Sequence, residues 1–197
     1  MLLLGSRLLH IPVMSLQTGA RLAHTEKPII NPANLHIYAY EVDGPLLTEK
    51  PAFLRTADVR EYGRLGMIID STDELVGLED VIQIEKLYKL GFPLVGMNVV
   101  DEHKHRLGKV DDYVVDTTQY VIQQLNVRRG LLKGITDTGL LINRSQIIEI
   151  NDDAIIVKSL TKRTAEPVMQ SLRTEFVNPF RGKKASPQPE PESAANT

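Results

Sequence analysis

The sequence has no cysteine among its 197 residues. Disulfide bonds, thiolate metal sites and cysteine nucleophiles are therefore excluded, and this absence is typical of a protein of the reducing cytoplasm, where we expect it to reside. Aromatic residues make up only 5% of the chain, and none alternates with basic residues as a base-stacking platform requires. The composition thus argues against sequence-specific reading of single-stranded nucleic acid.

The chain also has no run close to the roughly 18 apolar residues that a membrane helix needs. Its first ten residues, Met1 to His10, are rich in leucine but have no basic residue ahead of the leucines. Arg7 interrupts them, and no small-residue cleavage site follows. A first β-strand is therefore a better interpretation of this segment than a signal peptide.

Positive charge is scarce in the body of the chain and concentrated near its end. Residues 1–157 hold 16 Lys/Arg and 21 Asp/Glu, a balance of −5. Residues 158–187 hold seven basic and two acidic residues, a balance of +5. A basic segment on an acidic body can contact an anionic surface such as RNA, or fold back on its own domain.

What the sequence does contain is one pattern of apolar residues that occurs twice. The stretch from Ile29 to Val42 overlays Val114 to Val127 at an offset of 85 residues, and both predict a strand, a four-residue polar turn and a second strand. Asp58 to Tyr62 overlays Gln146 to Ile150 at an offset of 88. Such recurrence indicates duplicated structural units. We predict two small β-domains in tandem, which pack on each other because each is near the lower size limit for a core.

Elsewhere, short extended runs alternate with turn signals, which favours an all-β barrel or sandwich over a parallel sheet. The stretch from Met67 to Val76 predicts a hairpin that turns at Ser71 to Asp73. Residues 78–90 predict a short strand and a helical turn that ends at Gly91. Ile147 to Val157 predicts a last hairpin.

Two parts of the second half resemble the PRC-barrel family. Residues 94–102 (Leu-Val-Gly-Met-Asn-Val-Val-Asp-Glu), followed by residues 106–112 with their Leu-Gly-Lys-Val run, are similar to the family's opening: an apolar strand, an acidic hairpin and L-G-K-V. Residues 142–150 and 154–157 are similar to its closing strands.

The first half departs from that pattern, because Ala23 stands where the glycine falls and His24 where the lysine falls. We assign it through the internal repeat, and the resemblance then covers roughly four-fifths of the chain. The family implies a small, strongly bent antiparallel β-barrel used as a binding module. We therefore predict an all-β protein with two tandem small antiparallel PRC-type β-barrels, a short linker and a disordered C-terminal tail. The expected domains are residues 1–88, 91–160 and 161–197.

Similar proteins in the family have several roles. They include the C-terminal domain of a ribosome-maturation factor that docks on a ribosomal protein, the cytoplasmic part of the photosynthetic reaction-centre H subunit, small sporulation-associated proteins and archaeal cell-division proteins. Fold resemblance alone does not select among these roles.

The best candidate for metal chemistry is His103-x-His105. Two imidazoles two residues apart on a strand face the same way, and Asp101 or Glu102 can add an oxygen ligand. However, the segment is predicted to be a solvated hairpin loop, and a site would need a third ligand from elsewhere. We therefore predict no metal site here.

Other patterns are weaker still. The aspartate pairs at 111–112 and 152–153 place neighbouring carboxylates on opposite faces of a strand, and residues 130–134 lack the G-K-[ST] ending of a phosphate-binding loop. No serine stands in a recognisable nucleophile motif. We expect no catalytic residue, no cofactor and no enzyme activity.

A binding surface is the better prediction, and its candidate residues are basic or apolar. The second barrel offers a basic patch of Arg128, Arg129, Lys133 and Arg144. The C-terminal segment offers an auxiliary anchor of Phe176, Phe180, Arg181, Lys183 and Lys184.

We therefore expect a non-catalytic adaptor or scaffold that binds a protein partner through its tandem barrels, with no small-molecule substrate. Strand edges give a second route to such binding, because a partner segment can add to an open edge. One alternative is a ribosome- or RNA-associated maturation factor. Another is a membrane-proximal scaffold that binds anionic lipid through the basic segment.

Overall fold

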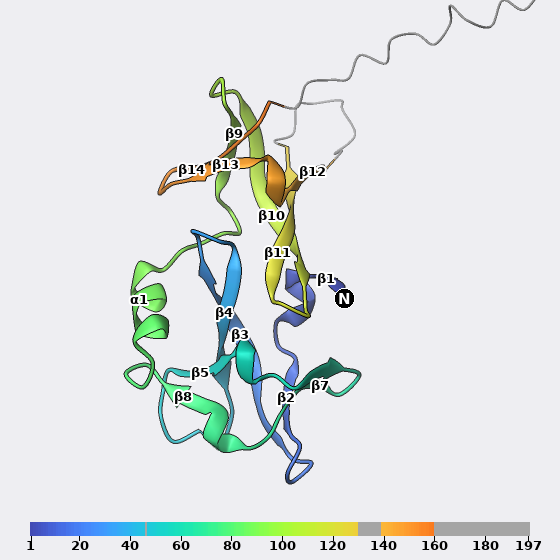
Figure 1. Ribbon diagram of the computed structural model, residues 1–197, viewed down its shortest axis with the longest axis vertical. Coiled ribbons are helices and arrows are strands. Elements are labelled where there is room, and N and C mark those ends of the chain that lie inside the picture. Colours follow the sequence, from blue (N-terminus) through green and yellow to red (C-terminus); the bar gives the residue numbers. More distant parts are fainter. Residues whose placement is uncertain (46, 130–138, 160–197) are drawn as a thin grey trace, which may run out of the picture. The chain divides into compact units, whose positions relative to one another are not determined.

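The computed structural model describes residues 1–45, 47–129 and 139–159 (Figure 1). All the described residues belong to one compact unit, residues 1–160. Within the described residues this unit is strand-rich, as predicted, and its one α-helix is nine residues long. No helix in these ranges combines the length and hydropathy needed to cross a membrane. The tail that we predicted to be disordered lies outside the described residues.

The strands are β1 (Leu2–Leu4), β2 (Pro12–Ser15), β3 (Arg21–Asn31), β4 (His36–Asp43), β5 (Ala52–Arg55), β6 (Glu61–Gly63), β7 (Gly66–Ile69), β8 (Leu75–Gly77), β9 (Asn98–Asp101), β10 (Arg106–Asp116), β11 (Val121–Arg128), β12 (Leu140–Asn143), β13 (Ile147–Ile150) and β14 (Ala154–Val157). The helices are α1 (Ile82–Leu90) and the 3-10 turns η1 (Gly5–Leu8), η2 (Thr56–Asp58), η3 (Thr72–Glu74) and η4 (Arg144–Gln146).

The strands of the two halves are paired in the same way. Each half is built on a long antiparallel hairpin, β3–β4 in the first and β10–β11 in the second. The preceding strand, β2 or β9, pairs with the first arm, and the following strand, β5 or β12, pairs with the second arm. A final hairpin, β6–β7 or β13–β14, then returns so that β7 or β14 lies beside β2 or β9. The strand pairing therefore recurs with the offsets seen in the sequence.

The irregularities of the two hairpins recur as well. In β3 the register shifts after Thr25 and after Ile29, and in β10 it shifts after Val110 and after Val114. Such β-bulges bend a strand and increase its local twist. Both hairpins are therefore bent at equivalent positions, 85 residues apart in the chain.

The hairpin turns repeat the same backbone conformation. The last turn residue is left-handed in both, with φ of 53° at Leu35 and 51° at Tyr120. The first turn residue, Asn31 or Asp116, accepts a hydrogen bond on its side-chain oxygen from the N–H two residues later, at 3.0 Å in both turns. This local bond explains why Asn and Asp suit the start of the turn.

The strand content agrees with the predicted all-β fold, but the pairing is not antiparallel throughout. The β2–β7 and β9–β14 pairs are parallel, because the last hairpin of each half returns alongside the first strand in the same direction. Among the described residues the ladders form one open sheet, in the order β13-β14-β9-β10-β11-β4-β3-β2-β7-β6. The 3-10 turns η2 and η4 redirect the chain after β5 and β12, so neither strand pairs with the one that follows it.

The predicted hairpin from Met67 to Val76 is also wrong. β7 pairs with β2 and β6, whereas β8 pairs with β5. Between them, η3 begins with a capping box: the Ser71 hydroxyl accepts the backbone N–H of Asp73 at 3.1 Å, and the Glu74 carboxylate accepts the backbone N–H of Ser71 at 2.7 Å. This cap starts a new turn of helix and sends the chain to a different edge.

The segment before the second half is a helix rather than a strand and a single turn. Residues 78–80 form a turn, and α1 begins after Val81 and ends at Gly91. The φ of 60° at Gly91 allows its N–H to bind the carbonyls of Leu87 and Tyr88. The buried face of α1, Ile84 and Leu87, packs on a small apolar cluster contributed by β3, β4 and β5.

The N-terminal segment belongs with the second half. β1 pairs with β10, and Ser6 of η1 donates its hydroxyl to the Asp112 carboxylate at 2.6 Å. α1 in turn packs on β3, the counterpart of β10. The segment before the first half, β1 and η1, therefore packs on the second half, and the helix before the second half, α1, packs on the first half. Consistent with this exchange, one core cluster contains buried residues of both halves, from Leu8 to Val157.

Candidate functional site

The predicted basic patch is not one surface in the described part of the chain. Arg128 ends β11, is largely exposed and pairs with Asp111 of β10 at 3.1 Å. Arg144 begins η4 beyond the far end of β12, next to Asn143, whose partner on β11 is Gln124. At the rise of a β-strand, Arg128 and Arg144 therefore lie about 13 Å apart along β11.

Of the other predicted contact residues, the structure describes only Arg129. Arg129 follows β11 and is exposed. The remaining candidates lie outside the described residues: Lys133, Phe176, Phe180, Arg181, Lys183 and Lys184.

Arg144 instead lies beside an open strand edge. Within the described residues β13 pairs with β14 alone, which leaves its other side free. The strand contains a bulge at Ile148, whose side chain is 52% exposed. Such an edge presents unpaired main-chain donors and acceptors, and natural proteins usually protect it with charge, proline or a covering segment.

A groove of about 390 Å³ runs along this edge. One wall consists of Arg144 and the residues of β13, and the other is the turn of residues 32–35 at the tip of the β3–β4 hairpin. The two halves therefore contribute to the same groove. They meet there because β4 and β11 bridge each other through His36 and Val121. We call the groove lined by residues 32–35, Arg144 and β13 the edge groove.

The predicted pair His103 and His105 does not converge with a third ligand in the described structure. His105 binds the Asp101 carboxylate through Nδ1 at 3.0 Å, while His103 approaches Glu102 only at 4.0 Å. Asp101 also accepts the backbone N–H groups of His103 and His105 at 2.9 and 2.8 Å. The Asp101 carboxylate therefore holds the β9–β10 turn together through hydrogen bonds, and both histidine side chains lie in a hairpin loop.

The electrostatics of Asp101 follow from these contacts. Its partial burial acts to raise the pKa of the carboxyl, but the hydrogen bonds from His105 and His103 outweigh it. The pKa of Asp101 is therefore lowered, and the ionised form is the one that the turn stabilises.

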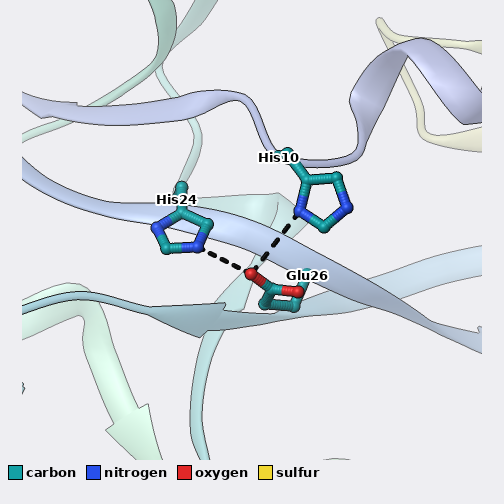
Figure 2. Close-up of side chains that lie close together, drawn as sticks. All are labelled: His10, His24 and Glu26. Atoms are coloured by element: carbon teal, nitrogen blue, oxygen red, sulfur yellow. Dashed lines mark ion pairs between the residues drawn. The ribbon is translucent and has the colours of Figure 1, made fainter.

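The structure brings together a different group, which the sequence analysis missed. His10, His24 and Glu26 place one ligand atom each within 4.8 Å of one another. Figure 2 shows the Glu26 carboxylate between the two imidazole rings, 2.6 Å from Nε2 of His24 and 3.5 Å from Nδ1 of His10. The only signal in the sequence was the spacing of His24 and Glu26, which puts both side chains on one face of a strand.

No curated protein matches this sequence. The family model of the PRC-barrel domain matches residues 91–163, a range that begins after α1 and includes β9 to β14. The predicted resemblance of the second half is thereby confirmed. A PRC-barrel domain is found at residues 91–163.

Proposed function

We propose that this protein is a non-catalytic adaptor that binds a protein partner at the edge groove, and that residues 1–88 form a second barrel of the PRC type. The observation that carries the binding proposal is that β13 pairs only with β14 among the described residues, and that Ile148 is exposed on it. The second barrel is supported by the strand pairing and bulges that β2 to β7 share with β9 to β14.

The proposed occupant is an extended segment of the partner. A strand that adds to β13 gains affinity from main-chain hydrogen bonds, and its alternate side chains enter the groove. Arg144 places a cation at one end of the groove, which favours an acidic residue in the corresponding part of the segment. Because the turn of residues 32–35 forms the other wall, both halves contact the same partner.

A site-specific crosslink tests this proposal. A photoreactive amino acid at Ile148 is expected to trap one discrete partner in the native host, whereas the same group at Ile82 is not. Ile82 is a matched control because it is an exposed isoleucine, on α1, away from the groove.

The trapped partner is then purified and its affinity measured directly. Ile148→Asp is expected to weaken binding by more than about tenfold, as is typical of a residue at the centre of an interface. Arg144→Glu is expected to weaken binding as well, because it reverses the charge at one end of the groove, and Ile82→Asp is expected to leave binding unchanged. Equal binding by the Ile148→Asp variant would refute the edge as the contact. An intramolecular crosslink from Ile148 to residues 160–197 would show that the chain covers its own edge.

A second candidate function rests on the charge of residues 158–187, which carry seven basic and two acidic residues. In that case the protein is a ribosome- or RNA-associated maturation factor. Co-sedimentation with ribosomes should then fall steeply as salt is raised, because contacts to phosphate release counterions. It should also be lost when the chain is truncated after Ser159, while binding at Ile148 persists.

A further inference from the structure

His10, His24 and Glu26 carry the donor atoms of a transition-metal site. Two imidazole nitrogens and one carboxylate oxygen are a donor set used by zinc, with bonds of about 2.0 to 2.2 Å. A tetrahedral ion with such bonds holds its ligand atoms about 3.3 Å apart. Glu26 Oε1 lies 2.6 Å from His24 Nε2 and 3.5 Å from His10 Nδ1, so these two distances bracket that value, and all three ligand atoms lie within 4.8 Å of one another.

The backbone fixes His10 over the other two residues. His24 and Glu26 lie on β3, two residues apart, with Thr25 between them. Thr25 is fully buried and holds the segment that contains His10: its carbonyl accepts the His10 N–H at 2.7 Å, and its hydroxyl donates to Leu8 at 2.7 Å and accepts from Ile11 at 3.1 Å. The three ligands are therefore arranged in advance by hydrogen bonds that do not involve their own side chains.

His10 also has an unusual conformation. Its φ is 57°, in the left-handed region, which is unfavourable for any L-residue with a Cβ. The second half shows what the fold requires there: Gly96 donates its N–H to Val110 at 2.8 Å, as His10 does to Thr25, and has φ of 92°. A histidine thus stands where its structural counterpart is glycine. Strain of this kind supports a hypothesis of function when side-chain contacts compensate for it.

The comparison of the two halves also shows that the fold does not itself require two histidines and a glutamate at these positions. The counterparts of His24 and Glu26 in β10 are Lys109 and Asp111, and Asp111 pairs with Arg128. The second half therefore carries an ordinary ion pair on the same scaffold. The two imidazoles are a property of the first half alone.

We propose that His10, His24 and Glu26 form a binding site for a borderline divalent metal ion of the Zn²⁺ class. Nitrogen and oxygen donors of this kind favour such ions over Ca²⁺ and Mg²⁺. The site is open to solvent, because the His10 side chain is 69% exposed, and three ligands leave a coordination position for water or for a group from a partner. The ion ties the segment that leads from β1 into β2 to strand β3.

Metal titration of the full-length, untagged chain tests the proposal. Zn²⁺ is titrated in competition with a chromophoric chelator, and Co²⁺ is used as a spectroscopic probe. The wild-type chain is expected to bind one ion, and His10→Asn, His24→Gln and Glu26→Gln are each expected to lower the affinity by more than tenfold. Asn tolerates left-handed φ, so His10→Asn removes the imidazole with little change in the backbone.

Two controls make the result decisive. His103→Gln with His105→Gln removes the other histidine pair and is expected to leave Zn²⁺ binding unchanged. His10→Gly introduces the residue found at the equivalent position of the second half, so it should keep the fold and abolish the thermal stabilisation by Zn²⁺ that wild type shows. Wild-type affinity in His10→Asn, or loss of binding only in the 103/105 variant, overturns the proposal.

Discussion

The backbone N–H of Ile37 donates a hydrogen bond to the carbonyl oxygen of Tyr120 at 2.8 Å. Its counterpart 85 residues later, Ile122, donates to Leu35 at 2.9 Å, and Leu35 is the counterpart of Tyr120. The two halves thus meet through the same residues, related by a local two-fold axis. A closed symmetric contact of this kind is how two copies of one surface usually associate.

This junction predicts that the halves unfold together. Ile37 and Ile122 are both fully buried in a core cluster that spans the two halves. Ile37→Ala and Ile122→Ala should each lower the free energy of unfolding by about 2 to 5 kcal/mol. Both should shift the same single transition in urea, followed by circular dichroism and by hydrogen exchange.

The exposed Ile82 of α1 supplies the control for that experiment. Ile82→Ala should change the free energy of unfolding by less than about 0.5 kcal/mol. Two separate transitions, one moved by each core variant, would show that the halves are independent.

A pair of glycines explains where the first half departs from the family pattern. A Cβ on Gly108 would lie 2.3 Å from the backbone oxygen of Arg128, so β10 and β11 approach too closely there for any side chain. In the first half that position is Ala23, and a glycine just after the second arm allows the close approach instead: a Cβ on Gly44, which follows β4, would lie 2.5 Å from the oxygen of Leu22. Each hairpin therefore has one glycine at such a contact, in the first arm of the second half and directly after the second arm of the first half.

Gly108→Ala and Gly44→Ala should both be destabilising, by about 1 to 3 kcal/mol, because backbone atoms must move in each case. Thermal unfolding of the two variants measures the effect. Gly139→Ala is the control, since a Cβ there meets no atom of the described residues within 4 Å. A neutral Gly44→Ala variant would show that the first hairpin does not use its glycine in this way.

The sequence predicted those parts of the fold that local pattern determines. The two hairpins, their polar turns and the repeat follow from alternation and turn chemistry within about 30 residues. The parallel β2–β7 and β9–β14 pairs could not be predicted in this way, because they depend on which strand edges remain free after the hairpins form. The wrong hairpin at Met67 to Val76 has the same origin, since both strands found partners elsewhere.

In the candidate sites, too, single residues could be predicted from local pattern, whereas contacts between distant segments could not. Arg144 was predicted, but the opposite wall of the edge groove comes from the β3–β4 turn, more than 100 residues earlier in the chain. His10 and His24 meet only because Thr25 holds the loop of His10 over β3. Neither relationship is visible in a linear pattern.

The lowered pKa of Asp101 predicts an acid-sensitive turn. Hydrogen bonds from His105 and His103 overcome the effect of burial and keep the carboxyl ionised below the usual value of about 3.9. A carboxyl whose pKa is lower in the folded state contributes stability above its unfolded pKa, and that contribution is lost as the pH falls through the folded pKa. NMR titration should therefore show the amides of His103 and His105 shifting with a midpoint below pH 3.9.

Asp101→Asn should remove this midpoint and loosen the β9–β10 turn. Asp153→Asn is a suitable control, because the exposed side chain of Asp153 lies in the β13–β14 turn, where Asn151 is the residue that accepts the local backbone bonds. An unchanged midpoint in Asp101→Asn would assign the titration to another group.

Two buried tyrosines predict a stabilising substitution. The rings of Tyr40 and Tyr120 pack edge to face at 6.5 Å, and among the described residues neither buried hydroxyl has a hydrogen-bond partner. An unsatisfied buried hydroxyl costs about 1 to 3 kcal/mol. Tyr40→Phe should therefore raise the free energy of unfolding by about 1 kcal/mol at neutral pH, whereas Tyr38→Phe, at a half-buried tyrosine, should not.

The same burial makes the fold sensitive to alkali. It raises the pKa of Tyr40 well above 10 and, together with the charge of Tyr62, raises the pKa of Tyr120 to about 12. Because the folded state prefers the neutral phenols, their contribution to stability is complete below pH 10 and is lost as the pH rises toward 12. Phenolate absorbance should therefore increase cooperatively with unfolding, and the Tyr40→Phe variant should unfold at a higher pH than wild type. Ionisation of all six tyrosines in a gradual curve, before any loss of circular dichroism, would contradict this account.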